Sequence, residues 1–227
     1  MTMNMRKTTL EDAAGSAPAE PPPDCALCER LVDFRTKNIE ARPDWFNGAA
    51  PSFGDPKARL LIVGLAPGLQ GANRTGRPFT GDYAGDLLYA TLAEFGFSEG
   101  VYAARPDDGL VLRDAMITNA VRCVPPENKP TGAEINACRP HLVSRIAALP
   151  RLRAILCLGK IAHDSTVKAL GAKASEAPFG HGARFEKDGA TLFDSHHCSR
   201  YNTQTRRLTP EMFRAVFSDI RELLDAA

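Results

Sequence analysis

The first residues suited to chemistry form a glycine-rich loop, which begins Gly64-Leu65-Ala66-Pro67-Gly68 and ends at Gly81-Asp82. The apolar run 59–63 before it predicts a buried strand. Ligands of α/β proteins bind at the carboxyl ends of such strands, and glycines let backbone N–H groups approach an anion closely. Neither the dinucleotide-binding pattern nor the Walker pattern is present. The loop is therefore a candidate ligand site, with a solvated surface loop as the alternative.

Cysteines form the second group. Cys25 and Cys28 make a C-x2-C pair, whereas Cys123 and Cys138 stand singly, and Cys157 falls inside a predicted strand. Disulfides are disfavoured in a cytosolic chain, so the first four suggest a metal or a cluster. Zinc sites more usually contain a second C-x2-C pair. The spacing alone leaves an iron–sulfur cluster, zinc and no metal as open alternatives.

Composition limits the partners of the protein. A chain of 227 residues with a net charge of +1 is long enough for one domain with a proper core. This charge excludes a globally basic nucleic-acid binder, so a DNA partner requires a locally basic face. The arginines that could form such a face are Arg74, Arg77, Arg200, Arg206 and Arg207. The sequence contains neither a membrane-length apolar run nor a signal peptide, which predicts a cytoplasmic protein.

These residues must be positioned by alternating strands and helices. Apolar runs predict strands at 59–63, 115–121, 154–159 and 191–194. Apolar spacing and capping residues predict helices near Leu31, over 87–95, from Thr131, from 159 to Gly171, and from Thr209 onward. The expected fold is an α/β three-layer sandwich with a central, mostly parallel four-stranded sheet.

Two further expectations concern segments of the chain. Residues 1–23 contain little to bury and end in three prolines, which predicts a disordered tail before an ordered domain over 24–227. Pro140 lies inside the helix predicted from Thr131 and is expected to break or restart it.

A family resemblance rests on five motifs in order. They are 64–68, Gly76-Arg77-Pro78-Phe79-Thr80-Gly81-Asp82, 118–123 with Pro125-Pro126, Ala137-Cys138-Arg139-Pro140, and 197–203. Together they resemble the iron–sulfur uracil-DNA glycosylases of family 5, the UDGb type. Leu65 stands where family 4 carries a glutamate, and Cys198 stands where the family usually has proline.

The resemblance implies a uracil-DNA glycosylase-like fold and hydrolysis of uracil, with other deaminated bases as further candidates, from single- or double-stranded DNA. It implies that Phe79 stacks on the flipped base, Asn119 reads its polar edge, His197 donates to its carbonyl oxygen and Asp82 holds the water. The residues 64–68 would form the floor of the base pocket. Four cysteines would hold a [4Fe–4S] cluster, namely Cys25, Cys28, Cys123 and Cys138.

The resemblance also implies DNA contacts from Arg74, Arg77, Ser199, Arg200, Tyr201, Asn202 and Arg206. The protein is expected to act as a monomer. No lysine occurs in 64–85 or in 196–209, which predicts a glycosylase without lyase activity. The alternatives are a non-catalytic or single-turnover uracil-DNA binding module and a redox iron–sulfur protein. Without the resemblance, Phe79 would be interpreted as a core aromatic residue and Asp82 as a helix cap.

Overall fold

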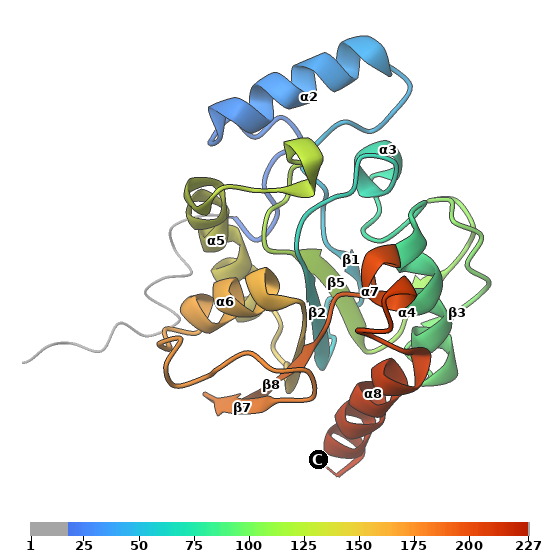
Figure 1. Ribbon diagram of the computed structural model, residues 1–227, viewed down its shortest axis with the longest axis vertical. Coiled ribbons are helices and arrows are strands. Elements are labelled where there is room, and N and C mark those ends of the chain that lie inside the picture. Colours follow the sequence, from blue (N-terminus) through green and yellow to red (C-terminus); the bar gives the residue numbers. More distant parts are fainter. Residues whose placement is uncertain (1–17, 227) are drawn as a thin grey trace, which may run out of the picture.

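The computed structural model describes residues 18–226, which form a six-stranded sheet between two layers of helices (Figure 1). The strand order is β1-β5-β2-β6-β8-β7. The central four strands are parallel and are β5 (Ala115–Asn119), β2 (Leu60–Gly64), β6 (Ala154–Leu158) and β8 (Ala190–Ser195). They match the four predicted strands, so the predicted α/β fold class is confirmed. Two antiparallel edge strands add to the predicted count, β1 (Phe53–Gly54) and β7 (Arg184–Lys187).

The central strands are buried along almost their whole length because helices cover both faces of the sheet. Alternate residues serve two separate cores. Leu60 and Ile62 pack in the core that contains residues of α4 (Tyr83–Glu94) and α8 (Pro210–Asp225). Leu61 and Val63 pack in the opposite core with α5 (Gly132–Ala147) and α6 (Lys160–Ala169). Figure 1 shows these two helix pairs on opposite sides of the sheet.

Predicted residues begin two of these helices and end a third. Thr131 and Glu134 form a capping box at the start of α5, and Thr209 caps α8. Gly171 follows α6 with a φ of 69°, as expected of a helix stop. The expectation for Pro140 is wrong, because α5 continues through it from Gly132 to Ala147.

Shorter elements connect this framework. They are α2 (Glu29–Ala41), α3 (Ala72–Thr75), β3 (Ser98–Glu99), β4 (Val111–Leu112), η1 (Pro126–Asn128) and α7 (Arg200–Gln204). In Figure 1, α2 lies beyond one end of the sheet and α7 lies close to α4. Within residues 18–226, none of the helices has the length and apolar character needed to cross a bilayer.

The predicted tail, 1–23, lies mostly outside the described residues, and only 18–23 are described. There Glu20 accepts hydrogen bonds from the guanidinium groups of Arg122 and Arg145 and, at 2.8 Å, from the backbone N–H of Ser52. Arg122 is one of the largest fully buried side chains, so Glu20 supplies the counter-charge that its burial requires. Disorder over 1–17 stays a prediction.

Candidate active site

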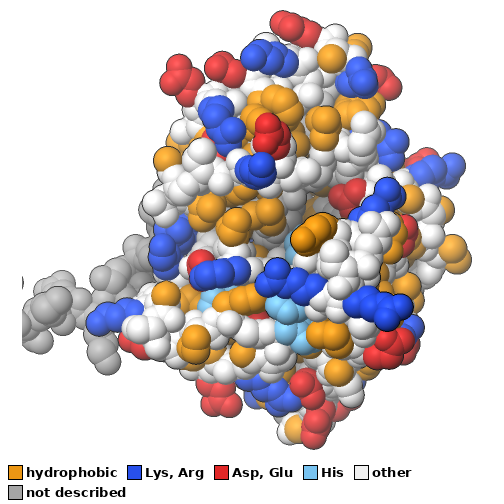
Figure 2. Space-filling model, in the orientation of Figure 1, with side chains coloured by type: hydrophobic (Ala, Val, Ile, Leu, Met, Phe, Trp, Pro, Cys, Tyr) orange, Lys and Arg blue, Asp and Glu red, His pale blue; other side chains and the backbone are white. Residues whose placement is uncertain are grey.

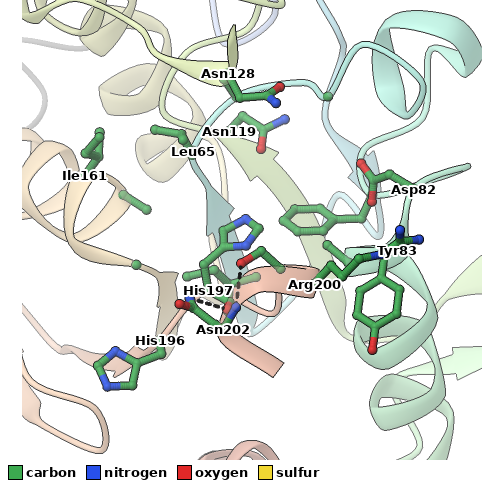
Figure 3. Close-up of a pocket in the computed structure, with 18 of the residues that line it drawn as sticks. Leu65, Asp82, Tyr83, Asn119, Asn128, Ile161, His196, His197, Arg200 and Asn202 are labelled. Carbon is green, nitrogen blue, oxygen red and sulfur yellow. Dashed lines mark hydrogen bonds between the residues drawn. The ribbon is translucent and has the colours of Figure 1, made fainter. Parts of the chain in front are cut away.

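The carboxyl ends of the parallel strands open onto one cavity of about 720 Å³ (Figure 3). It is lined by residues that follow β2, β5, β6 and β8, where the topology of a parallel sheet places ligands. Most of the predicted pocket residues reach it, namely Leu65, Ala66, Pro67, Gly68, Phe79, Asp82, Asn119 and His197. The sheet therefore brings together side chains that are far apart in the sequence.

Gly64 lies directly behind this cavity. A Cβ atom at Gly64 would stand 2.4 Å from Asn119 Oδ1 and 2.8 Å from the ring of Phe79. Gly64 also pairs with Asn119 across β2 and β5. Because Gly64 has no side chain, the Asn119 amide and the Phe79 ring can both lie close to its Cα atom.

Phe79 is held in an unusual backbone conformation. Its φ of 54° is left-handed, which is rare for a bulky residue. Two tyrosines hold the backbone around it. The Tyr89 hydroxyl donates to the carbonyl of Pro78 at 2.7 Å, and the Tyr102 hydroxyl donates to that of Phe79 at 3.2 Å. The ring consequently faces the cavity while its backbone is fixed from behind.

Arg77 completes this support. Its guanidinium donates to both oxygens of Asp108 at 2.7 Å, and its Nε donates to Thr80 Oγ1 at 2.7 Å. The Arg77 side chain is 5% exposed and that of Asp108 is 1% exposed. Hydrogen bonding from Arg77 holds the pKa of Asp108 well below its usual range. We call Arg77, Thr80, Tyr89, Tyr102 and Asp108 the Phe79 frame.

Asn119 and His197 each present a buried polar atom without a protein partner. Asn119 is 4% exposed, and its Oδ1 accepts no hydrogen bond, while Nδ1 of His197 is buried and unpaired. Burial lowers the pKa of His197 to about 4, so the imidazole is neutral at pH 7. Its ring stacks near that of Phe79, with centroids 5.8 Å apart and planes 25° apart. Buried polar atoms without partners are rare and indicate a ligand or water.

Asp82 occupies another wall of the cavity, apart from His197 (Figure 3). It is the N-cap of α4 and accepts a hydrogen bond from Gly85 N at 3.3 Å. Burial raises its pKa above the usual aspartate value, although the backbone hydrogen bonds oppose this shift. A Cβ at Gly71 would approach Asp82 Oδ2 to 2.2 Å, so the glycine-rich loop makes room for the carboxylate.

The loop that carries His197 is anchored on both sides. Asn202 Nδ2 donates to the carbonyl of His197 at 2.8 Å, and Cys198 Sγ lies 3.4 Å from the carbonyl of Ala84 in α4. Ser199 caps α7 by accepting from Asn202 N. Asn202 and Ser199, which were predicted to contact DNA, thus also position the backbone after His197.

The other predicted DNA contacts divide into two groups. Arg74, Arg200, Tyr201 and Arg206 are exposed, and the Arg200 guanidinium lies 5.1 Å from the ring centroid of Tyr83 beside the cavity. Arg77 requires a correction, because its charge is buried against Asp108 and cannot reach a phosphate. Sequence inspection could not distinguish these arginines, since Asp108 lies 31 positions away.

Several cavity residues were not predicted. They include Asn128, Lys160, Ile161, Phe179 and His196. Lys160 and Ile161 follow Gly159 at the end of β6, so strand order could have indicated them. Lys160 also qualifies the expectation that no lysine lies at the site. Its Nζ contacts both oxygens of Asp164 at 2.8 Å.

The four predicted ligand cysteines line a second, smaller cavity beneath α2 and α5, and all four are free thiols. Within residues 18–226, no three His, Cys, Asp or Glu side chains converge closely enough to hold a single metal ion. Tetrahedral zinc needs such convergence, whereas a wider cluster with one thiolate on each iron does not. Arg35 Nη1 lies 3.9 Å from Cys123 Sγ, and the backbone N–H of Arg122 donates to Cys138 Sγ at 3.3 Å. Four thiols around one cavity, with N–H groups close to two of them, are a donor set that suits an iron–sulfur cluster.

Comparison with known proteins assigns the family. A family model described as the uracil DNA glycosylase superfamily matches residues 51–221. A type-5 uracil-DNA glycosylase of Thermus thermophilus is 44% identical over 88% of this chain and 93% of its own length. One from Pyrobaculum aerophilum is 39% identical over 85% of this chain and 86% of its own. A type-4 enzyme of the same organism is 36% identical but covers 62% of this chain and 65% of its own length.

Proposed function

Because this chain belongs to the uracil DNA glycosylase superfamily, we propose that it hydrolyses the N-glycosidic bond of uracil in DNA and leaves an abasic site. The resemblance to family 5 is confirmed by the type-5 relatives. The observation that best supports the activity is the pair of buried, unpartnered polar atoms on Asn119 and His197 beside the ring of Phe79. A base extruded from the DNA stack carries an aromatic face and a polar edge that would satisfy them.

His197 would act on the leaving base. Cleavage places negative charge on the base, and a donor aimed at its carbonyl oxygen stabilises the transition state. Since the pKa of His197 is about 4, the ring is neutral at pH 7 and still has one N–H to donate. Phe79 would stack on the base, and the Asn119 amide would read its polar edge.

Asp82 would act on the sugar side. The oxocarbenium-like sugar needs an oriented water, and a carboxylate on the other wall of the cavity can hold one. The backbone hydrogen bonds from the first turn of α4 fix the carboxylate while it caps the helix. Capping and water positioning are therefore compatible in one residue.

The activity would stop at base removal. Lyase action requires a neutral amine that attacks the sugar. Lys160 is the lysine that lines the described cavity, and its Nζ is engaged in hydrogen bonds to both Asp164 oxygens at 2.8 Å rather than being free to attack a sugar. Borohydride trapping should therefore yield no covalent enzyme–DNA adduct. An adduct that disappears in Lys160→Ala would contradict this assignment.

Cys25, Cys28, Cys123 and Cys138 would hold a [4Fe–4S] cluster, as their shared cavity supports. The cluster would supply structural cross-linking rather than a reaction step, because none of the four cysteines lines the base pocket. Purified protein should contain iron and acid-labile sulfide, and stoichiometric zinc without iron would contradict the proposal. We further propose that the protein is cytoplasmic, where disulfides are disfavoured and cysteines are available as ligands, and that it acts as a monomer.

Single-turnover assays on uracil-containing oligonucleotides test the function. The expected result is free uracil and an intact strand with an alkali-labile site. Tight binding of uracil DNA without release would instead identify a binding module. Reversible reduction of a cluster without any base release would identify a redox protein. The same assay with hypoxanthine, xanthine and mismatched thymine would define which bases are removed.

A further inference from the structure

One wall of the cavity takes no part in the roles assigned above. It is formed by Phe179 and His196, both half-buried, whose ring centroids lie 6.0 Å apart. In Figure 3, His196 and Ile161 lie on one side of His197, and Asp82 lies on the other. The cavity thus has a second aromatic surface, separated from the predicted water position by the base-contacting histidine.

Both rings are supported from behind. His163 packs edge-on against Phe179 with centroids 5.5 Å apart, and its ring nitrogens bond Asp194 Oδ1 and the Ala177 carbonyl at 2.8 Å each. His181 stacks on His196 at 5.2 Å with planes 19° apart, and its Nδ1 accepts from His196 N. This wall is therefore rigid, and rigid rings bind a flat ligand with little loss of side-chain entropy.

Cations border the same wall. Arg207 and Lys160 are exposed and line the cavity beside these rings, although Lys160 also pairs with Asp164. Figure 2 shows Lys and Arg side chains beside the exposed histidine atoms on this face. Burial and the nearby Arg207 lower the pKa of His196, which favours a neutral ring. Aromatic faces next to cations are the means by which proteins hold single-stranded nucleic acid.

The size of the cavity agrees with a second occupant. Its volume of about 720 Å³ is in the range of pockets that bury a drug-sized ligand, which exceeds the needs of one pyrimidine ring. Phe79, Asn119 and His197 account for the deep part of the lining. The part next to Phe179 and His196 is left for another flat group.

We propose that Phe179 and His196 form a stacking subsite for the nucleobase next to the target nucleotide on the same strand. The subsite rests on the proposed function. It acts most strongly when that neighbouring base is unpaired, since a base held in a duplex must first leave its own stack. The subsite would make flanking sequence and strand state affect binding without changing the chemistry at Asp82.

The test combines enzyme variants with modified substrates. Single-stranded oligonucleotides carry a non-hydrolysable 2′-fluoro uracil nucleotide, flanked by normal bases or by a tetrahydrofuran spacer that lacks a base on the 5′ or the 3′ side. Phe179→Ala should weaken binding about 10-fold with normal flanks, the scale of one stacked base. With the spacer on the relevant side it should have no effect, which also identifies that side. Duplex substrates should show a smaller loss.

Controls separate stacking from folding. Phe95→Ala removes another half-buried ring, which packs on Phe217 outside the cavity, and should leave binding unchanged on every substrate. Phe179→Trp keeps an aromatic ring and should bind as tightly as wild type. His196→Ala, like Phe179→Ala, should weaken binding with normal flanks but not with the spacer on the relevant side. An equal loss with all flanks, or no loss, would overturn the subsite. Failure of wild-type protein to release uracil from any substrate would refute the proposed function instead.

Discussion

The base pocket and the Phe79 frame are both buried and polar, but they differ in how fully their polar atoms are paired. In the frame, Arg77 bonds Asp108 and Thr80. In the pocket, Asn119 Oδ1 and His197 Nδ1 have no partner. Leaving a buried polar atom unpaired costs about 1–3 kcal/mol, so folding alone does not favour that arrangement. The paired region holds the shape, and the unpaired region is prepared for a ligand.

The same difference shows in the charges. In the frame, the ion pair with Arg77 lowers the pKa of Asp108 and so favours its charged form. In the pocket, burial lowers the pKa of His197 to about 4 and raises that of Asp82, which favours the neutral form of each. Perturbed groups in a cavity are typical of catalytic sites. The comparison therefore supports the chemical roles proposed for Asp82 and His197, and it indicates a supporting role for Arg77 and Asp108.

Among the pocket variants, Asp82→Asn should cause the largest loss of catalytic rate. The single-turnover rate should fall roughly 10²–10⁴-fold because the group that orients water is lost. Asparagine caps a helix about as well as aspartate, so the free energy of unfolding should change little. Binding to uracil DNA should also be retained. A rate within a few-fold of wild type would show that another group holds the water.

Asp108→Asn should destabilise the Phe79 frame. It leaves the Arg77 guanidinium without its counter-charge, and breaking a buried pair costs about 3–5 kcal/mol of unfolding free energy. The low pKa of Asp108 stabilises the fold above the unfolded-state pKa, and this contribution is lost as pH falls. Denaturant unfolding at neutral and acidic pH should show a smaller pH dependence in the variant.

The matched control for this change is Asp107→Asn. Asp107 is the adjacent carboxylate, and its ion pair with Arg105 is exposed to solvent. Its loss should leave unfolding nearly unchanged, because exposed pairs contribute little. Equal effects of the two substitutions would contradict the distinction between a buried frame and the surface.

His197→Ala should lower the single-turnover rate about 10²–10³-fold, the cost of one lost donor at a developing oxyanion. Unfolding free energy should change little, because the removed Nδ1 has no partner in the folded protein. His197→Gln keeps an N–H donor and should recover part of the rate. A rate loss that vanished when stability was matched would assign His197 to the fold instead.

The pH profile distinguishes the two pocket residues. Above pH 5, His197 is already neutral because its pKa is about 4. The Asp82 carboxyl group must be deprotonated to orient the water. The rate should therefore rise with pH through the raised pKa of Asp82 and then level off. Asp82→Asn should remove this rise, whereas His197→Gln should keep it. A rise that persists without Asp82 would contradict the assignment.

The central sheet could be predicted because β2, β5, β6 and β8 each contain a run of apolar residues. Such a run can be recognised in the sequence without knowing which strands or helices it contacts in the fold. The edge strands could not. β1 has two residues, and β7 alternates in exposure with charged residues, so each depends on its pairing with the neighbouring strand. Family motifs indicated Phe79 and Asn119, but Arg77 was assigned to DNA because its type alone cannot reveal a buried partner. Phe179 and His196 belong to no motif and meet only through the fold.

Leu65→Ala should have the smallest effect on the rate of uracil release. It separates the residues that shape the pocket from those proposed to act in the reaction. Leu65 lines the cavity beside Asn119, but its side chain offers shape and no polar group (Figure 3). Loss of one apolar group changes discrimination by about 1–3 kcal/mol, so uracil release should fall by no more than about 100-fold. The larger space should favour purine bases, which raises the ratio of hypoxanthine to uracil release.

The control is Leu87→Ala, which changes a half-buried residue of α4 outside the cavity and should leave that ratio unchanged. A rate loss above 100-fold with an unchanged ratio would mean that Leu65 supports the catalytic groups rather than the shape of the base site.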